Sequence, residues 1–314
     1  AMPEVKSLRV KNRKRLDVLL AQTWPALSRH DVEDMVTSNQ VLINGKPALK
    51  PGQYVEPEDV VEAQAPVREE KEGAVPLLLS LPMQVQFEDE VLLVVDKPAG
   101  IPTHAKRRQQ EGTTLSAQLR ERYPDLANVG GIDRAGIIQR LGEDVSGLML
   151  VARDRETYRT MKREVKRGRV AHTYFALVEG HLEGTDYIDV PIGSSKRQRG
   201  KLVVAREGRP AETTYTSMSY YNSGDEHYTL LKVEPDSSRM HQMRVHLSWL
   251  GYPIVGDTLY GSSRQHLLKD RLFLHLAILT FHHPRRGEQL EVQSELPEAL
   301  GSILKYMQRP RYLK

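Results

Sequence analysis

Two short segments hold the side chains best suited to chemistry, QRLGEDVSG at 139–147 and RMHQMRVH at 239–246. Arg140 in the first segment can bind phosphate and stack on bases, because a guanidinium is planar and always charged. His241 and His246 in the second segment are five residues apart, a spacing that does not place both on one face of a helix. No histidine motif of a zinc protease occurs either, and we therefore expect no metal site.

Basic residues form clusters along a chain whose charge is nearly balanced. The 45 Lys and Arg outnumber the 41 Asp and Glu by four. The basic runs are RVKNRKR at 9–15, KRR at 106–108, KREVKRGR at 162–169, KRQRGK at 196–201 and Arg285–Arg286. Clustered Lys and Arg favour a polyanionic partner, since each contact with a phosphate releases condensed counterions. The alternative is that the runs are ordinary solvated surfaces.

The composition excludes several classes of protein. The chain has no cysteine, which excludes disulfides, thiolate metal sites and cysteine nucleophiles and agrees with the cytoplasmic location that we expect. Its longest apolar runs, such as VLLVVD at 91–96, are far shorter than the ~20 residues of a membrane-spanning helix. Residues 1–15 lack the apolar core of a signal peptide. No glycine-rich nucleotide loop occurs, and we expect no cofactor.

The first 63 residues read as a small αβ unit. The leucines of RLDVLL at 15–20 recur at helical spacing and predict a helix from Arg15. Ser28 is a suitable N-cap for a second helix, with the sequence SRHDVEDMV. VLING at 41–45 and VVEA at 60–63 read as strands, the first of which ends in an Asn-Gly turn.

The remainder of the chain predicts a linker and a larger domain. Residues 64–82 combine prolines with a charge run and read as a linker. The strand candidates are QVQFEDEVLLVVDK at 84–97, IIQRL at 137–141, GLMLVA at 147–152, TYFALVEG at 173–180, YTLLKVEP at 228–235 and LTFHHP at 279–284, and the helix candidates are 113–122, 155–167 and 239–250. This mixture predicts an α+β fold with a mixed, mainly antiparallel sheet. We expect a domain at 1–63, a linker at 64–82 and a domain at 83–314.

The first unit resembles the RNA-binding domain that is shared with small-subunit ribosomal protein S-four. The resemblance rests on RLDVLL, SRHDVEDMV and VLINGKPALKPGQYVEPEDVV, in that order. It implies RNA binding by Lys14, Arg15, Arg29 and His30, which stand near the N-terminal ends of the two expected helices, where the helix dipole also favours phosphate. The alternative is a small folded cap that contacts no RNA.

The larger domain resembles the RluA-type RNA pseudouridine synthases in four stretches that follow the order of that family. They are VLLVVDKPAGIPTH at 91–104, AGIIQRLGEDVSGLMLVA at 135–152, VAHTYFALVEG at 170–180 and SSRMHQMRVHLSWLGYPIVGDTLYG at 237–261. The resemblance implies a pseudouridine-synthase-like fold, conversion of uridine to pseudouridine in RNA, and no metal or organic cofactor. LHLAILTFHHPRRGE at 274–288 is also similar to the family, and we read His275 and His283 there as structural.

Gly142 stands where the family has its catalytic aspartate, which starts the breakage of the bond between uracil and ribose. Glycine has no side chain that could attack a carbon or remove a proton. Glu143 and Asp144 are adjacent, but consecutive side chains point in different directions, so neither is a ready substitute. Arg140 matches the arginine that is thought to enter the stack vacated by a flipped nucleotide.

Tyr174 and Arg244 match two further catalytic positions of the family. The resemblance implies that Tyr174 packs against the target uracil and assists the proton step, whereas its strand pattern alone indicates a half-buried tyrosine. It also implies that Arg244 pairs with the catalytic aspartate. Without that carboxylate, we expect water, Asp144 or a bound phosphate or sulfate to compensate the charge of Arg244.

We therefore expect a catalytically impaired RNA-binding protein on a pseudouridine synthase scaffold, and a monomer. One alternative is an active synthase that uses another acid or has an aspartate at position 142 in its natural form. Another is a general nucleic-acid chaperone, whose binding would depend on salt alone. The candidate catalytic positions are Gly142, Arg140, Tyr174 and Arg244, and the candidate RNA-binding residues are Lys14, Arg15, Arg29, His30, Arg140, Lys166 and Arg167. The expected partner is structured RNA, ribosomal RNA in particular.

Overall fold

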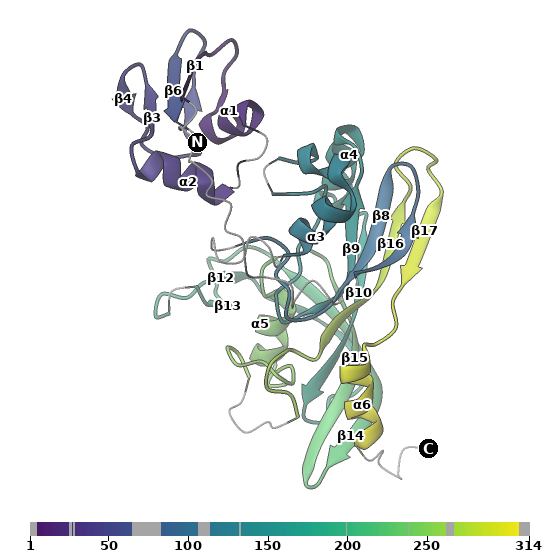
Figure 1. The fold of residues 1–314 in the computed structure, drawn as a ribbon. Helices are drawn as coiled ribbons and strands as arrows, with labels where there is room; N and C mark the ends of the chain where they lie inside the picture. The colour runs from purple at the N-terminus through teal and green to yellow at the C-terminus, as the bar shows by residue number, and fades with distance from the viewer. Residues whose placement is uncertain are drawn as a thin grey trace, which may run out of the picture. The chain divides into compact units, whose positions relative to one another are not determined.

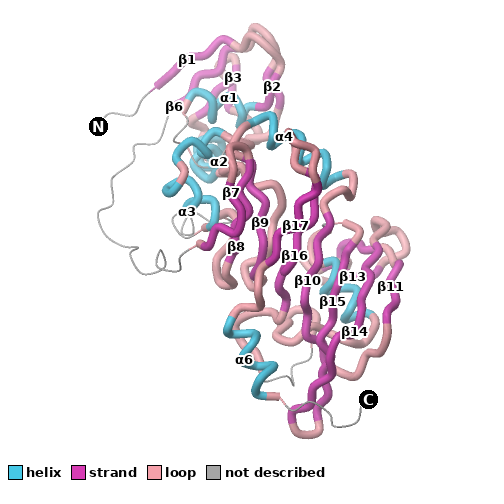
Figure 2. The backbone as a smooth tube through the Cα atoms, turned by 90° about the vertical axis from the view of Figure 1, so that its right-hand side faces the viewer, coloured by secondary structure: helices cyan, strands magenta, loops and turns pink. Residues whose placement is uncertain are grey.

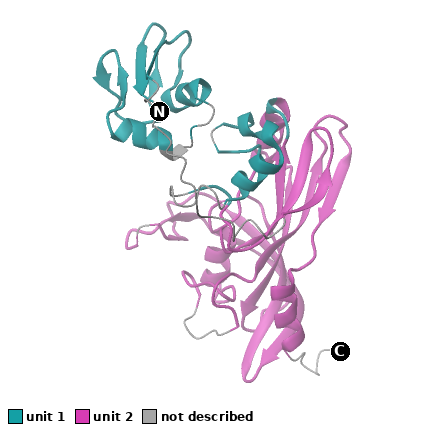
Figure 3. Ribbon diagram, in the orientation of Figure 1, with its two compact units in different colours: residues 1–82, 103–137, 153–155 teal, residues 83–102, 138–152, 156–314 magenta. Residues whose placement is uncertain are grey.

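The computed structural model describes residues 5–24, 27, 29–64, 83–105, 114–131, 133–198, 200–237, 239–261 and 267–307, with the backbone alone for Arg29 and His30. The chain forms two compact units (Figure 3). The first comprises residues 1–82, 103–137 and 153–155, and the second comprises 83–102, 138–152 and 156–314. Two segments of the expected domain at 83–314 thus group with the N-terminal residues. The expected linker, apart from Gln64, lies outside the described residues.

The N-terminal part of the first unit is a four-stranded antiparallel sheet with two helices (Figure 1). Its elements are β1 (Val5–Arg9), β2 (Lys14–Arg15), α1 (Leu16–Thr23), α2 (Arg29–Thr37), β3 (Val41–Ile43), β4 (Lys46–Pro47), β5 (Tyr54–Val55) and β6 (Val60–Gln64), and the sheet order is β1-β6-β3-β4. Leu16 and Leu20 of α1 are fully buried in its core, as their spacing predicts. Asn44 and Gly45 both have positive φ and form the predicted turn between β3 and β4. The Ser28 cap lies outside the described residues.

The first unit also contains α3 (Leu115–Arg122) and the 3-10 helix η2 (Pro124–Asn128). Thr114 caps α3, because its hydroxyl oxygen accepts the backbone N–H of Ala117 at 3.1 Å. The helix predicted at 113–122 is therefore confirmed within the described residues.

The second unit is built on a nine-stranded sheet with the order β11-β14-β15-β10-β16-β9-β8-β7, in which β17 also pairs with β16 (Figure 2). Its elements are β7 (Gln84–Glu88), β8 (Leu92–Lys97), β9 (Ser146–Ala152), α4 (Arg155–Lys166), β10 (Ala171–Glu179), β11 (Thr185–Asp189), β12 (Ile192–Ser194), β13 (Leu202–Val204), β14 (Glu212–Ser223), β15 (Glu226–Pro235), α5 (Gln242–Trp249), β16 (Leu274–His282), β17 (Gln289–Gln293) and α6 (Glu298–Tyr306). Every described pairing in this sheet is antiparallel except that of β9 with β16. The predicted α+β fold with a mixed, mainly antiparallel sheet is confirmed.

The junction of β9 and β16 is short, and side chains reinforce it. Only two residue pairs join the strands, His275 with Ser146 and Leu276 with Gly147. Around this junction Arg271 donates to the Ser146 hydroxyl at 2.7 Å, Ser146 contacts the Nδ1 atom of His275 at 2.9 Å, and the Nε2 atom of His275 contacts a further serine at 3.0 Å. That residue, Ser294, donates to a carboxylate of β8. This junction network connects the part of the sheet that carries β9 to the part that carries β10.

The prediction of a strand at 137–141 is wrong. Ile138 donates its backbone N–H to Leu150, but the backbone N–H of Leu150 goes to the side-chain oxygen of Gln139 at 3.2 Å. The backbone ladder therefore ends, and the chain continues as a loop to β9. β14 and α6 were not predicted from the sequence, and they border a common part of the core of the second unit.

Candidate functional site

The segment that contains Gly142 is a loop that leads into β9. The backbone N–H of Val145 donates to the Gly142 carbonyl at 3.2 Å. Two neighbouring segments hold the loop, because Gly100 donates to the Glu143 carbonyl at 2.7 Å and Leu272 donates to the Asp144 carbonyl at 3.1 Å. These backbone contacts place residue 142 without any contribution from its side chain.

The backbone at residue 142 does not require glycine. Gly142 is exposed and does not have a positive φ. A Cβ atom there would meet the Cγ2 atom of Val145 at 3.4 Å, an ordinary contact. Gly147 differs, because it has a φ of +130° and its Cβ would lie 2.4 Å from the backbone of Leu276. An aspartate side chain can therefore start from position 142 without strain, whereas Gly147 is required by the fold.

Lys97 is a buried lysine that holds the same loop. Its exposure is 0%, and its Nζ atom donates to two carbonyls of its own turn at 2.8 Å and to the Glu143 carbonyl at 3.4 Å. Burial and, to a smaller extent, the charge of Arg271 together lower the pKa of Lys97 to about 7, although the charge of Asp144 opposes the change. This role of Lys97 was not predicted from the sequence, although a lysine at the end of a buried strand was a signal for it.

Arg244, the third residue of α5, forms a buried ion pair with Asp257. Its Nε and Nη2 atoms donate to the two carboxylate oxygens at 2.7 Å each. We predicted that water, Asp144 or a bound anion would compensate the charge of Arg244. That prediction is wrong, because the hydrogen-bonded partner of Arg244 is Asp257. Asp257 reaches α5 because Gly256 before it adopts a φ of +85°.

The ion pair keeps both partners charged. Burial raises the pKa of Asp257, but the hydrogen bonds and charge of Arg244 and two backbone N–H groups outweigh burial and hold this pKa below its usual range. Burial lowers the pKa of Arg244, but the contact with Asp257 and the charge of Asp144 produce a net rise. The ring of Tyr260 lies 5.1 Å from the guanidinium, and His241 contacts the Tyr260 hydroxyl at 3.0 Å.

Tyr174 lies on the face of the sheet that carries α5. It is level with Val233 of β15 and Tyr215 of β14. Thr213, two residues before Tyr215 and so on the same face, bonds to Gln242 and His246 of α5. The structure thus places Tyr174 and Arg244 on one side of the sheet.

Burial alone raises the pKa of Tyr174, and no carboxylate charge contributes to the rise. The tyrosine is 8% exposed, and its hydroxyl has no hydrogen-bond partner in the described part of the chain. The described residues therefore do not provide an acid beside this hydroxyl.

Asp144, in the Gly142 loop, interacts electrostatically with two basic side chains of the second unit. It raises the pKa values of Arg244 and Lys97. Among the described residues it forms no ion pair with either cation. Asp144 thus brings the Gly142 loop within electrostatic range of Arg244 but does not replace Asp257.

Arg140 is exposed at the start of the same loop. Within the described ranges, no hydrogen bond or ion pair engages its guanidinium. The preceding Gln139 is buried, and its side-chain nitrogen has no partner in the described structure. Gln139 therefore anchors the segment while Arg140 is available to a ligand.

The candidate RNA-binding residues of the first unit have different environments. Lys14 donates to Gln22 at 3.1 Å. The guanidinium of Arg15 makes two hydrogen bonds to Asp17, at 2.7 and 3.0 Å, so a phosphate would compete with that carboxylate. The side chains of Arg29 and His30 lie outside the described structure.

The two candidates at the end of α4 are both exposed. Arg167 lies 3.5 Å from Glu164, whereas Lys166 has no ion pair among the described residues. Lys166 is therefore the better placed of the two to contact a phosphate.

Three buried histidines of the second unit bind to protein groups. Both ring nitrogens of His246 are engaged, one by Thr213 at 2.8 Å and the other by the Val190 carbonyl at 2.9 Å. His275 and His283 are buried and hydrogen-bonded, in agreement with a structural role. Within the described residues, no group of His, Asp or Glu is arranged to hold a metal ion, and no helix is long and apolar enough to cross a membrane.

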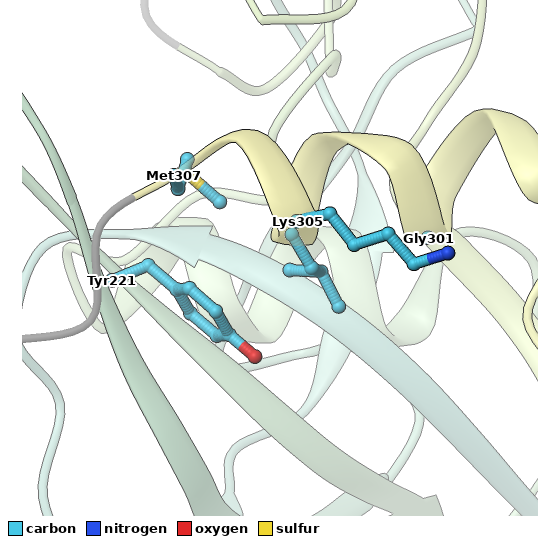
Figure 4. Close-up of a pocket in the computed structure, with 5 residues that line it drawn as sticks. Tyr221, Gly301, Lys305 and Met307 are labelled. Carbon is cyan, nitrogen blue, oxygen red and sulfur yellow. The ribbon is translucent and has the colours of Figure 1, made fainter.

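A pocket lies between β14 and α6 (Figure 4). It is lined by Tyr221, Gly301, Leu304, Lys305 and Met307. None of the candidate catalytic residues borders it, and its wall contains no carboxylate. We therefore do not assign it to the chemistry of the site.

Comparisons with known proteins identify both parts of the chain. The family model of RNA pseudouridylate synthases matches residues 91–249, and the S4 domain model matches residues 14–61. The chain is 39% identical over 300 residues to an uncharacterized RNA pseudouridine synthase of Chloroflexus aurantiacus, with 94% of this chain and 90% of that protein covered. It is 31% identical over 303 residues to ribosomal large subunit pseudouridine synthase D of Yersinia pestis, with 93% and 90% covered. Human RNA pseudouridylate synthase domain containing 1 superposes with a TM-score of 0.59 and 25% identity, over 77% of this chain and 94% of that one.

Proposed function

The chain belongs to the RNA pseudouridylate synthase family, and we propose that it binds structured RNA at this family's site but is impaired in converting uridine to pseudouridine. The observation that carries the proposal is the exposed Gly142, at the position of the family's catalytic aspartate. The loop around it is held by backbone hydrogen bonds, which supports a loop that keeps its conformation without a carboxylate at position 142.

The acids near position 142 do not reproduce the missing group. Asp257 is already held by both nitrogens of the Arg244 fork, and its Oδ1 atom also accepts the backbone N–H groups of Leu259 and Tyr260. The charge of Asp144 raises the pKa of Arg244 but does not contribute to the raised pKa of Tyr174. Since catalytic geometry tolerates an error of only about 0.5 Å, a neighbouring acid at another position is a poor substitute.

RNA binding needs none of these acids. The exposed Arg140 is available to stack on a base or bind a phosphate. The S4 domain supplies a second RNA-binding part. We infer ribosomal RNA as the partner, because synthase D of Yersinia pestis is named for the large ribosomal subunit and matches nearly the whole chain.

The decisive experiment is to restore the carboxylate. Ribosomal RNA from cells is incubated with the unaltered protein, with Gly142→Asp and with Gly142→Asn, and pseudouridine is mapped. The asparagine variant is the matched control, since it has the same shape without an ionised oxygen. We expect new pseudouridine with Gly142→Asp alone, at a rate at least about 10³-fold above the other two proteins, because removing one member of a catalytic group costs this much or more. Efficient modification by the unaltered chain would refute the proposal.

The second candidate function is an active synthase that uses Asp144. It is favoured by the electrostatic coupling of Asp144 to both Arg244 and Lys97. In that case the unaltered protein forms pseudouridine and Asp144→Asn abolishes the activity. If both proteins are equally inactive while both bind RNA, this second function is excluded.

A further inference from the structure

Helix α4 has a narrow buried side and a basic exposed side. Thr157 and Met161 are its buried residues. On the opposite side, basic residues recur at i, i+3, i+4 and i+7 and all are exposed. This α4 basic face consists of Arg159, Lys162, Arg163 and Lys166.

Three of the four cations of the α4 basic face have no acidic partner among the described residues. Glu164 is engaged by Arg167 and Arg169, at 3.5 and 3.4 Å. In the described part of the chain, Arg159, Arg163 and Lys166 have no carboxylate partner.

The face also contains like charges at the spacing that destabilises a helix. Arg159 and Arg163 are four residues apart, as are Lys162 and Lys166, and like charges at this spacing oppose helix formation. A polyanion bound along the face would remove that repulsion.

The face is tied to the segment that leads into the candidate site. The Nζ atom of Lys162 donates to the Ile138 carbonyl at 3.0 Å. Ile138 is two residues before Arg140, whose guanidinium is exposed. Lys162 thus connects the α4 basic face to the segment that contains Arg140.

We propose that the α4 basic face is a second contact surface for the sugar-phosphate backbone of the RNA, with Arg159, Arg163 and Lys166 as its phosphate-binding residues. The proposal rests on the RNA binding proposed above. One helical turn rises ~5.4 Å, so cations on successive turns can contact successive parts of a strand. A protein partner fits less well, because none of the exposed large hydrophobic residues lies on α4.

The test is the salt dependence of RNA affinity. A triple variant, Arg159→Gln, Arg163→Gln and Lys166→Gln, removes three cations and keeps residues that support a helix. Its dissociation constant for a fragment of ribosomal RNA is measured at several salt concentrations beside the unaltered protein. Each lost phosphate contact reduces the slope of log affinity against log salt by about 0.7–0.9, so we expect a reduction of about 2.

A second triple variant controls for net charge. Lys232→Gln, Lys269→Gln and Lys305→Gln also removes three cations, at exposed or half-exposed positions away from α4. We expect its slope to change by less than about 0.5, since general field effects are weaker than contact effects. An unchanged slope in the α4 variant, or an equal loss in both variants, would overturn the proposal.

Arg140→Ala separates this proposal from the proposed function. If Arg140→Ala weakens binding while the α4 variant keeps the full slope, RNA binding at the site stands and the α4 surface is rejected. If the unaltered protein has no measurable affinity for RNA, both are rejected.

Discussion

Arg244 keeps its charge because Asp257 binds it at two points, so the guanidinium does not depend on residue 142. Breaking a buried ion pair by removing one partner leaves an uncompensated charge, which is strongly unfavourable. Because Asp257 is that partner, a residue without a carboxylate at position 142 leaves Arg244 paired. The fold around Arg244 therefore does not require an acid at position 142.

We predict that Asp257→Ala destabilises the second unit by on the order of 3 kcal/mol, because it leaves Arg244 buried without a partner. The side chains of Asp257 and Arg244 are 0% and 11% exposed, so water cannot easily compensate. Urea unfolding of the single variants and of the double variant Arg244→Met with Asp257→Ala measures the effect. The double variant should recover part of the stability, and a single-variant loss below about 1 kcal/mol would contradict the prediction.

The residues of the candidate site were proposed from the sequence, but their partners in the structure could not be predicted from it. Gly142, Tyr174, Arg244 and Asp257 all belong to segments that resemble the family. The pairing of Arg244 with Asp257 depends on a turn between α5 and β16, where Gly256 adopts a positive φ and lies against the backbone of Arg271. No spacing rule predicts this contact.

At the scale of elements, the junction of β9 and β16 positions the site. Tyr174 belongs to β10, on one side of this junction, and the Gly142 loop leads into β9, on the other. A guanidinium can only donate hydrogen bonds, so the Ser146 hydroxyl oxygen accepts from Arg271. The Ser146 O–H then donates to the Nδ1 atom of His275. His275 must then carry its proton on Nε2 and donate to Ser294. The junction network thus fixes one tautomer.

We predict that His275 is the neutral Nε2–H tautomer throughout the neutral pH range. Burial, with a smaller contribution from the positive charge of Arg271, lowers the pKa of His275 to about 4. Nitrogen NMR of histidine-labelled protein should show a protonated Nε2 and a bare Nδ1 from pH 5.5 to 8, with the signal assigned by its loss in His275→Gln. Ser146→Ala should shift this signal. A His275 that titrates near 6.5, the usual histidine value, would contradict the arrangement.

Elements with a clear period were predictable, and those with mixed patterns were not. The helix predicted at 239–250 is α5, and GLMLVA is part of β9. IIQRL has the composition of a strand but is a loop, since the Gln139 side chain replaces a backbone bond to Leu150. Tertiary contacts decide whether a side chain takes the place of a backbone partner in this way. The spacing of apolar residues along the sequence does not contain this information.

At the scale of the whole molecule, burial of basic side chains makes the stability of the second unit depend on pH. Lys97 and His275 both have pKa values below those of the unfolded chain, about 7 and about 4, mainly because of burial. Between the folded and unfolded pKa of each group, the unfolded chain binds more protons. Stability should therefore rise with pH in both windows, from 4 to 6.5 for the histidine and from 7 to 10.5 for the lysine.

The window above pH 7 gives the cleaner test, because carboxylates and most histidines no longer titrate there. From pH 7.5 to 9.5, we predict that the free energy of unfolding of the second unit rises by roughly 2 kcal/mol, since Lys97 is neutral in the folded state and still charged in the unfolded one. The two tryptophans are Trp24 and Trp249, so a Trp24→Phe protein reports on the second unit through Trp249 during urea unfolding. The rise should disappear in Lys97→Met, and a profile that is flat or falls with pH in the Trp24→Phe protein would show that Lys97 is charged in the folded state.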